Sequence, residues 1–583
     1  MSARVIVLKF GGSVLEYERS LGRAVHEIYR WRREGLGVVA VVSAFHGETD
    51  RLLARSRALG GGAHSTAAAA ATGESLAAAL LGAALDRAGV PACVLSPAAI
   101  RLLAEGEAED AAPIAVDTVS LAGALDREGV VVVPGFAGID RRGRTVLLGR
   151  GGSDLSALFL AHALGARCRL IKDVDGLYEW DPAHPDARGR PRRFELASWS
   201  DALATDGRIL QHRAVRFARE HALEFEVARA GASVETRVGP EPAAFAAAAT
   251  PVRPLRLALL GLGTVGGGVW HLARELPDEF EIAAVVCRDR ERARAFGVEE
   301  SLLHADAGHA LCADVDVVVE CLGGLEPARG AIAAALALGR DVVSANKRVL
   351  AEHGDEFAAL ARARGASLRG SAAVGGSAPI LERVAACRRE AILVRGVLSG
   401  SVNFVLERVG VGESLPRALE AARELGLTES DPARDLDGRD AADKLTLIAE
   451  VLGASRIGAS RIGASRIVAT REALDEHVAR RALDAHRRGM RLRQLAEVRL
   501  DARGVRASVR FQELDDDDAL FDLPGASNAA EIVGAHGVLD RAIGTGAGRW
   551  PTAQSILGDL QQLAREHRSE RARGELRPSA RAV

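Results

Sequence analysis

A lysine and a pair of glycines follow an apolar, β-branched run near the start of the chain, in the order Lys9-Phe-Gly-Gly-Ser13. Backbone N–H groups of residues without a Cβ can close on phosphate oxygens, and the lysine adds a positive charge. A lysine before such a turn is more often part of an ordinary turn. The motif therefore predicts phosphate binding only together with others.

Two more segments carry chemically useful groups in the first 240 residues. Gly149-Arg-Gly-Gly-Ser-Asp-Leu-Ser156 combines a guanidinium, a hydroxyl and a carboxylate in a glycine-rich turn before a helical pattern. Lys172-Asp-Val-Asp-Gly-Leu-Tyr178 follows a strand-like run. Phosphoryl transfer needs positioned charges around the phosphate more than covalent help, which residues of these types can supply.

A second glycine turn, Gly261-Leu-Gly-Thr-Val-Gly266, follows an apolar run and opens a helical pattern. That context turns a common motif into a dinucleotide-binding hypothesis, with Gly261, Gly263, Thr264, Val265 and Gly266 against the cofactor. The next strand-like run ends at Arg288, where an NAD enzyme usually has an acidic residue. A cation there favours NADPH over NADH, although Asp289 next to it keeps NADH open.

Asp440 and Lys444 are spaced i,i+4, which places them on one helix face. A lysine, or a water that it holds, is a suitable proton donor in a partly dry pocket. The alternative is an ordinary surface ion pair.

The elements that must position these groups are strands alternating with helices. The strand-like runs 37–43, 129–133 and 168–171 alternate with helical windows at 74–88 and 153–164, which predicts an α/β domain with a largely parallel sheet. The second part begins in the same way with runs at 281–287, 315–320 and 341–344 and then becomes mixed. A proline-punctuated stretch separates the two parts.

The composition is that of an ordinary globular chain of 583 residues, with 48% hydrophobic residues, 26% charged residues and a formal net charge of -2. It favours several domains and argues against nucleic acid or an anionic membrane as partners. The N-terminus lacks a signal-peptide pattern and no long apolar stretch is free of charges and glycines, so a cytoplasmic location is expected. Six scattered cysteines without a C-x-x-C pair indicate neither zinc nor disulfides and are expected to be reduced and mostly buried.

The ordered motifs of the first part, together with Ser43-Ala-Phe-His-Gly-Glu-Thr-Asp50 and Thr72-Gly-Glu74, resemble the amino-acid kinase superfamily and, within it, aspartokinase. The resemblance covers about residues 5–239 and implies MgATP as phosphoryl donor. It departs from the family pattern at Ala77, where serine is common, and at Lys172, where threonine is common. By this resemblance Lys9 stabilises charge and Asp154 holds it, the substrate contacts Ser43, Thr49, Glu74, Arg150 and Ser153, and the nucleotide contacts Gly11, Gly12, Ser13, Asp173, Asp175 and Tyr178.

The second part resembles homoserine dehydrogenase from about Leu255 to Glu566. The resemblance rests on ordered segments: Glu320–Gly324, Ser344–Lys347, Ala373–Pro379, Gly400–Phe404, Thr428–Lys444 and Gly544–Ala553. It implies that Lys347 and Lys444 deliver the proton and orient the substrate with Asp440 as partner, that Glu429 and Asp435 bind the substrate, and that Gly548 contacts the cofactor. It also implies a sodium site at the backbone of Val374, Gly376 and Ala378, although Ser371 stands where the family often has an acidic residue.

Together the two parts resemble bifunctional aspartokinase/homoserine dehydrogenase, which acts on small-molecule substrates and commonly forms homo-oligomers, here a dimer or tetramer. The implied domains are an amino-acid kinase fold at 1–239 and a linker at 240–254. A Rossmann domain at 255–345, completed by 540–566, and an α+β substrate and dimerisation domain at 346–539 follow. The alternative is an active dehydrogenase fused to a degenerate kinase module with a binding or assembly role.

The roughly fifteen residues between the two parts cannot hold the ACT regulatory domains that this family usually has there. We therefore expect feedback inhibition through such domains to be missing. A tandem repeat of Gly-Ala-Ser-Arg-Ile at 453–467 fits a tolerant loop, and no function is assigned to it.

Overall fold

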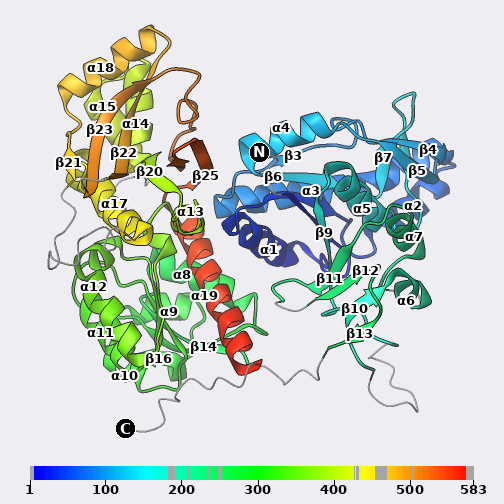
Figure 1. The fold of residues 1–583 in the computed structure, drawn as a ribbon, viewed down its shortest axis with the longest axis horizontal. Helices are drawn as coiled ribbons and strands as arrows, with labels where there is room; N and C mark the ends of the chain where they lie inside the picture. Colours follow the sequence, from blue (N-terminus) through cyan, green and yellow to red (C-terminus); the bar gives the residue numbers. More distant parts are fainter. Residues whose placement is uncertain are drawn as a thin grey trace. The chain divides into compact units, whose positions relative to one another are not determined.

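The computed structural model describes residues 5–180, 191–205, 209–232, 235–246, 253–425, 427, 432–453, 469–501 and 504–572. The chain divides into two compact units, which we describe separately (Figure 1). The N-terminal unit comprises Met1–Arg87 and Pro91–Pro251, and the C-terminal unit comprises Ala88–Val90 and Val252–Val583. Nearly all of the 453–467 repeat lies outside the described residues.

In the described part of the N-terminal unit, nine strands form a sheet that is parallel at most pairings. Its order is β13 (Ala244–Phe245), β10 (Phe194–Ser198), β12 (Thr236–Gly239), β11 (Phe225–Arg229), β9 (Arg167–Lys172), β1 (Val5–Phe10), β2 (Gly37–Val42), β6 (Val130–Pro134) and β3 (Cys93–Val94). A smaller sheet contains β5 (Asp110–Ala115), β4 (Leu103–Glu107), β7 (Ala137–Ile139) and β8 (Thr145–Leu147). The helices are α1 (Leu21–Arg33), α2 (Glu48–Ala58), α3 (Ala63–Ala88), α4 (Thr118–Glu128), α5 (Gly152–Leu164), α6 (Trp199–Ala204) and α7 (His212–Glu220).

The large sheet lies between helices. Its valine-rich central strands are buried on both faces, as expected for a parallel sheet. On one face Val7, Val39 and Leu170 pack against α4 and α5. The alternate residues of the same strands face α1, which contacts β1 and β2. This is the predicted α/β arrangement, but β13 adds a short strand inside the stretch expected to be a linker.

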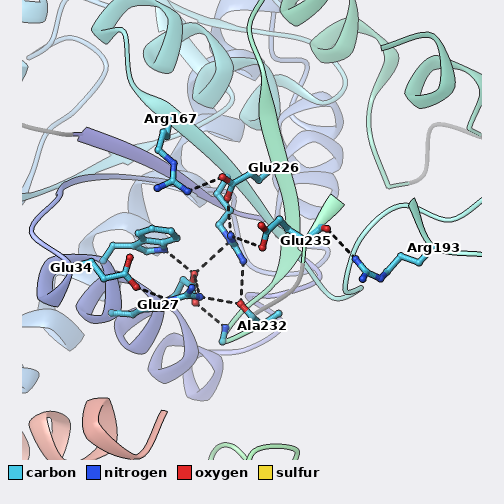
Figure 2. Close-up of polar contacts among 11 residues, drawn as sticks. Glu27, Glu34, Arg167, Arg193, Glu226, Ala232 and Glu235 are labelled. Atoms are coloured by element: carbon cyan, nitrogen blue, oxygen red, sulfur yellow. Dashed lines mark hydrogen bonds and ion pairs between the residues drawn. The ribbon is translucent and has the colours of Figure 1, made fainter. Parts of the chain in front are cut away.

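A buried arginine ties β9 to its neighbours. Arg169 is 2% exposed and lies near three carboxylates: Glu226 at 2.8 Å, Glu235 at 3.4 Å and Glu27 of α1 at 3.8 Å. Figure 2 shows these glutamates converging from α1, β11 and the segment before β12. A charge removed from water must be paired, and this pairing fixes the position of the strand that ends at Lys172.

In the described part of the C-terminal unit, the first sheet is wholly parallel. Its order is β16 (Leu303–His304), β15 (Phe280–Val286), β14 (Leu255–Leu260), β17 (Val317–Glu320), β18 (Asp341–Ser344) and β19 (Leu368–Arg369). Its helices are α8 (Thr264–Arg274), α9 (Arg290–Ala295), α10 (Ala307–Leu311), α11 (Ala328–Ala337), α12 (Lys347–Arg364) and α19 (Arg549–Ala572). Helices α8 and α19 cover one face and α10, α11 and α12 the other.

The C-terminal helix α19 packs on α8 as part of this three-layer domain, and Gly268 permits the close approach: a Cβ there would lie 2.8 Å from Ala553. Residues 540–566 are expected from the sequence to complete this domain, but residues up to Thr545 belong to a strand of another sheet. The parallel sheet, moreover, continues through β19 to Arg369, whereas the sequence places the end of this domain at 345. Strand β19 has only two residues, too few to show an alternating pattern.

The last sheet is mostly antiparallel. Its order is β21 (Thr470–Arg471), β23 (Gly504–Leu514), β22 (Arg491–Asp501), β20 (Ala391–Val397), β24 (Ser527–Gly534) and β25 (Gly537–Thr545). The accompanying helices are α13 (Ile380–Cys387), α14 (Gly400–Gly410), α15 (Leu415–Glu424), α16 (Ala433–Leu436), α17 (Arg439–Leu452) and α18 (Glu476–Arg487). Helices α13 and α17 share one apolar core with β20, β22, β23 and β24.

All six cysteines are free thiols, but only Cys168 is fully buried and Cys312 is exposed, so the expectation that most are buried is wrong.

Among the described helices, α3 alone has the length and mean hydropathy of a membrane span, although 44% of the relevant window is buried in the protein. It also contains Glu74 and two glycines, and Glu74 lines a cavity of the N-terminal unit.

Candidate active sites

A cavity of about 980 Å³ opens at the carboxyl ends of β1 and β9 in the N-terminal unit. Most of the predicted kinase residues line it, together with residues that the sequence did not single out. The predicted ones are Lys9, Gly11, Gly12, Ser13, Ser43, Thr49, Glu74, Ser153, Asp154, Asp173 and Tyr178.

Two buried lysines share one buried carboxylate in this cavity. Lys9 Nζ lies 2.7 Å from Asp154 Oδ1, and Lys172 Nζ lies 2.9 Å from Asp154 Oδ2. Burial lowers the pKa of Lys9 to about 8, against the opposing effect of Asp154. Burial alone would raise the pKa of Asp154, but the ammonium groups of Lys172 and Lys9 lower it to about 2.

The glycines of the first turn leave room for the lysine. A Cβ at Gly11 would lie 3.0 Å from Lys9 Nζ, and one at Gly12 would lie 3.3 Å from the carbonyl oxygen of Ala44. Helix α5 begins at the same cavity, with Ser153 and Asp154 in its first turn. Free N–H groups at the start of a helix favour anions. Lysine, glycines and helix terminus together can bind phosphate.

Glu74 forms another part of the cavity wall. Its side chain is buried, Thr49 Oγ1 donates to Oε1 at 3.3 Å, and no hydrogen-bond partner for Oε2 is found in the described part of the chain. Burial raises the pKa of this carboxyl to about 7. A buried carboxylate with a free oxygen suits a cationic ligand such as a substrate ammonium.

Two of the predicted kinase residues, Asp175 and Arg150, do not line the cavity, whereas Ser13, Asp173 and Tyr178 do. Ser13 Oγ donates to Asp173 Oδ1 at 3.1 Å, and Tyr178 donates to Asp175 Oδ1 at 2.8 Å. Arg150 is exposed. The substrate role expected for Arg150 therefore requires its long side chain to reorient when a substrate binds.

The glycine turn of the C-terminal unit connects β14 to α8. Gly261 has a φ of 99°, which only glycine adopts readily. A Cβ at Gly266 would lie 1.9 Å from the carbonyl oxygen of Gly261, whereas one at Gly263 would meet nothing within 4 Å. The turn thus needs glycine at 261 and 266 for its own geometry, while 263 leaves open space beside the N-terminus of α8 for a ligand.

The residues expected to select between NAD and NADP follow β15. Asp289 caps α9, where it accepts a hydrogen bond from the backbone N–H of Arg292 at 2.9 Å. Arg288 is exposed and has no hydrogen bond or ion pair to the residues that the structure describes. The carboxylate of Asp289 therefore caps helix α9, whereas the guanidinium of Arg288 is available to a ligand.

A second charged triad lies in the C-terminal unit. Lys444 Nζ is 2.8 Å from Asp440 Oδ2 on the next turn of α17 and donates to the carbonyl oxygen of Leu398 at 2.5 Å. Lys347, at the start of α12, pairs with the same aspartate. Asp440 and Lys444 are buried, whereas Lys347 is 40% exposed. The alternative of a surface ion pair does not fit this burial.

Burial sets the ionisation of this triad. It lowers the pKa of Lys444 although Asp440 opposes the shift, and the two lysines hold the pKa of Asp440 well below its usual range despite burial. Asp435 has a raised pKa because it is partly buried and lies near Asp440; Ser401 donates to it at 2.9 Å. A buried lysine with a lowered pKa is suited to transfer a proton. The predicted substrate residue Glu429 lies outside the described residues.

The expected cation-binding loop precedes α13. It is closed by hydrogen bonds from Ala378 N to Gly375 O at 2.9 Å and from Ser377 N to Thr545 O at 3.0 Å. Backbone carbonyls are hard oxygen donors, which suit sodium. Ser371 donates to Asp559 at 2.7 Å, so a carboxylate is present at this position although the residue itself is not acidic.

Comparison with known proteins identifies the C-terminal unit. The sequence profile of homoserine dehydrogenase matches residues 379–561 and that of its NAD-binding domain matches residues 261–369. The chain is 30% identical over 331 residues to the homoserine dehydrogenase of Neisseria gonorrhoeae, covering 73% of that protein and 54% of this chain. The chain belongs to the homoserine dehydrogenase family. The solved structure of the Thiobacillus denitrificans homoserine dehydrogenase agrees, with a TM-score of 0.50 and 30% identity over 57% of this chain and 76% of that one.

The N-terminal unit matches the amino acid kinase family over residues 4–227. It is 32% identical over 228 residues to the aspartate kinase of Pseudomonas fluorescens, covering 38% of this chain and 55% of that protein. The chain thus spans little more than half the length of this aspartate kinase. The predicted fold class and the resemblance to bifunctional aspartokinase/homoserine dehydrogenase are confirmed: one chain carries an amino acid kinase domain and the domains of a homoserine dehydrogenase.

Sequence reasoning overlooked how some residues take part. Lys172 stood out only as a departure from the kinase pattern, yet its ammonium lies in the cavity beside Lys9. The carbonyl of Leu398, which accepts from Lys444, carries no side-chain signal at all. For Lys172, the signal that could have indicated its role was its place at the end of a strand, just before Asp-Val-Asp-Gly.

Proposed function

We propose that the kinase domain transfers the γ-phosphoryl group of MgATP to the side-chain carboxylate of L-aspartate. A carboxylate oxygen bonds to phosphorus, the bond to the bridging oxygen of ADP breaks, and 4-phospho-L-aspartate forms. The Lys9–Asp154 pair at the base of the glycine turn is the observation that carries this proposal. It supports an active kinase over a degenerate module.

In this proposal Lys9 offsets the charge that develops on the transferred group, and Asp154 fixes its ammonium. Glu74 binds the substrate ammonium and Arg150 its carboxylate. The turn at Gly11–Ser13, Asp175 and Tyr178 contact the nucleotide. The carboxylate of Asp173 and the hydroxyl of Ser13 are oxygen donors of the kind that Mg²⁺ prefers.

The test is transfer of radiolabel from [γ-³²P]ATP to aspartate by the full-length chain, with glutamate and N-acetylglutamate as competing acceptors. We expect label on aspartate alone. Lys9→Met should abolish transfer, whereas Lys444→Met, in the other active site, is the matched control. Preferred labelling of another acceptor would overturn the assignment of the substrate.

We further propose that the dehydrogenase reduces L-aspartate 4-semialdehyde to L-homoserine, with NADPH preferred over NADH. The bound nicotinamide supplies hydride to the aldehyde carbon. Lys444 supplies the proton to the aldehyde oxygen, while Asp440 holds Lys444 and Lys347 in place. Asp435 and Glu429 bind the polar end of the substrate.

The cofactor proposal is supported by the space beside Gly263 and by the exposed Arg288. Gly548, just before α19, belongs to the same proposed cofactor site, and the loop at Val374, Gly376 and Ala378 is the proposed sodium site. Oxidation of homoserine with NADP⁺ and with NAD⁺ tests the preference. We expect a higher kcat/KM with NADP⁺; equal values would overturn the role of Arg288.

We also propose that the protein forms a homo-oligomer, a dimer or a tetramer. Light scattering on the purified chain measures the assembly.

A further inference from the structure

We propose that Lys172 is a second phosphoryl-contacting lysine of the kinase, which acts with Lys9 on the group in transfer. The inference rests on the proposed kinase function and extends it to a residue that the resemblance does not assign. Its basis is the contact of two ammonium groups with one buried carboxylate inside a cavity.

The charge balance of the cluster favours an anionic ligand. Asp154 is 3% exposed, and Lys9 alone would neutralise it. The side chain of Lys172 is 10% exposed, so it too has lost most of its hydration, yet it adds a second positive charge to a carboxylate that is already paired. Removing an ammonium from water costs several kcal/mol, and a cluster with one surplus charge does not recover that cost unless an anion joins it.

Among the residues that the structure describes, Asp154 is the carboxylate that forms an ion pair with Lys172. Asp173 is the nearest in sequence, but its carboxylate accepts from Ser13. Glu74 contacts Thr49, and burial raises its pKa to about 7, which weakens its negative charge near neutral pH. Asp50 also lines the cavity and has no hydrogen bond or ion pair to Lys172 in the described part of the chain, and Glu179, another cavity residue, pairs with Arg192 at 2.7 Å.

The position of Lys172 is fixed from behind. It is the last residue of β9, which pairs with β1 on one side and β11 on the other. Three residues earlier, Arg169 fixes the strand to Glu27 and Glu226 (Figure 2). A charge held in advance at the place where charge develops costs no reorganisation during the reaction.

The test compares two ligands in one preparation of the full-length chain. MgADP is bound with and without aluminium fluoride, which mimics the phosphoryl group in transfer, both in the presence of aspartate. In wild type we expect aluminium fluoride to tighten binding. Lys172→Met removes the charge at similar volume, and we expect it to lose most of this tightening, to change the Kd of MgADP less than threefold and to lower kcat about 100-fold.

The ratio of the two affinities does not depend on the folded fraction, so a less stable variant still gives an answer. NADPH-dependent turnover by the same preparation is the folding control for the dehydrogenase. Two results for Lys172→Met would overturn the inference, because each would mean that Lys172 only balances the charge of Asp154. In the first, aluminium fluoride tightens the binding of MgADP as much as it does in wild type. In the second, the affinity for MgADP alone falls by the same factor as the tightening.

Failure of the proposed function gives a different pattern. If wild type does not phosphorylate aspartate but shows Lys172-dependent tightening, the assigned substrate is wrong and the role of Lys172 stands. If wild type phosphorylates aspartate and Lys172→Met does so at the same rate, the function stands and this inference fails.

Discussion

In the proposed kinase mechanism, two residues with shifted ionisation set the pH dependence. Glu74 must be ionised to bind an ammonium and is protonated as pH falls through its pKa of about 7. Lys9 must be protonated and loses its charge as pH rises through about 8. We therefore predict a narrow bell for kcat/KM of aspartate, with limbs near these values, because this parameter reports the free enzyme. In Glu74→Gln the acidic limb should disappear; a limb that persists would exclude Glu74 as its source.

Lys444 is the proposed proton donor of the dehydrogenase. Removing a general acid typically costs 10²- to 10⁴-fold in rate, so Lys444→Met should lower kcat of semialdehyde reduction by about that factor. The Kd of NADPH should stay within about threefold, because Lys444 contacts Asp440 and Leu398 rather than the glycine turn. Stopped-flow hydride transfer measures the first quantity and fluorescence titration the second. A variant with a normal hydride-transfer rate would exclude the role.

At the level of elements, the turn between β14 and α8 permits a paired test. Gly266→Ala should lower the Tm of the dehydrogenase, because its Cβ would lie 1.9 Å from the carbonyl oxygen of Gly261. Gly263→Ala should leave Tm within a degree or two, since nothing lies within 4 Å, yet still weaken cofactor binding by filling the space beside α8. Calorimetric melting and NADPH titration separate the two effects. Equal losses of Tm would contradict the geometry.

The sequence predicted local elements well because their signals are local. An apolar run followed by glycines predicts each of the two strand–turn–helix units. Helical spacing alone predicts that Asp440 and Lys444 share one face of a helix. The contact of Lys172 with Asp154, 18 residues away, depends on the side-by-side placement of β9 and α5 against β1, which no short pattern encodes. The convergence of Glu27, Glu226 and Glu235 on Arg169 is unpredictable for the same reason.

Very short strands also limited the prediction of domain boundaries from the sequence. Strands β13 and β19 have two residues each, and both shift a boundary that composition placed elsewhere. Arg150 shows a limit of resemblance: a motif fixes which residue follows a turn but not where a long exposed side chain lies before a substrate arrives.

For the whole molecule, the short connection between the two enzymes has a regulatory consequence. Without room for ACT domains between them, threonine and lysine should leave kinase activity unchanged to within about twofold at millimolar concentration. Initial rates of aspartate phosphorylation with each amino acid test this. Inhibition at micromolar threonine would show that the chain binds the effector elsewhere.

We propose that one chain holds two independent active sites, each built on its own glycine turn. The most direct measurement is both turnovers, aspartate phosphorylation and NADPH-dependent semialdehyde reduction, on wild type, Lys9→Met and Lys444→Met. We predict that Lys9→Met loses the first and keeps the second, and that Lys444→Met does the reverse. Loss of both activities in either variant, or absence of either activity in wild type, would contradict the proposal of two independent sites.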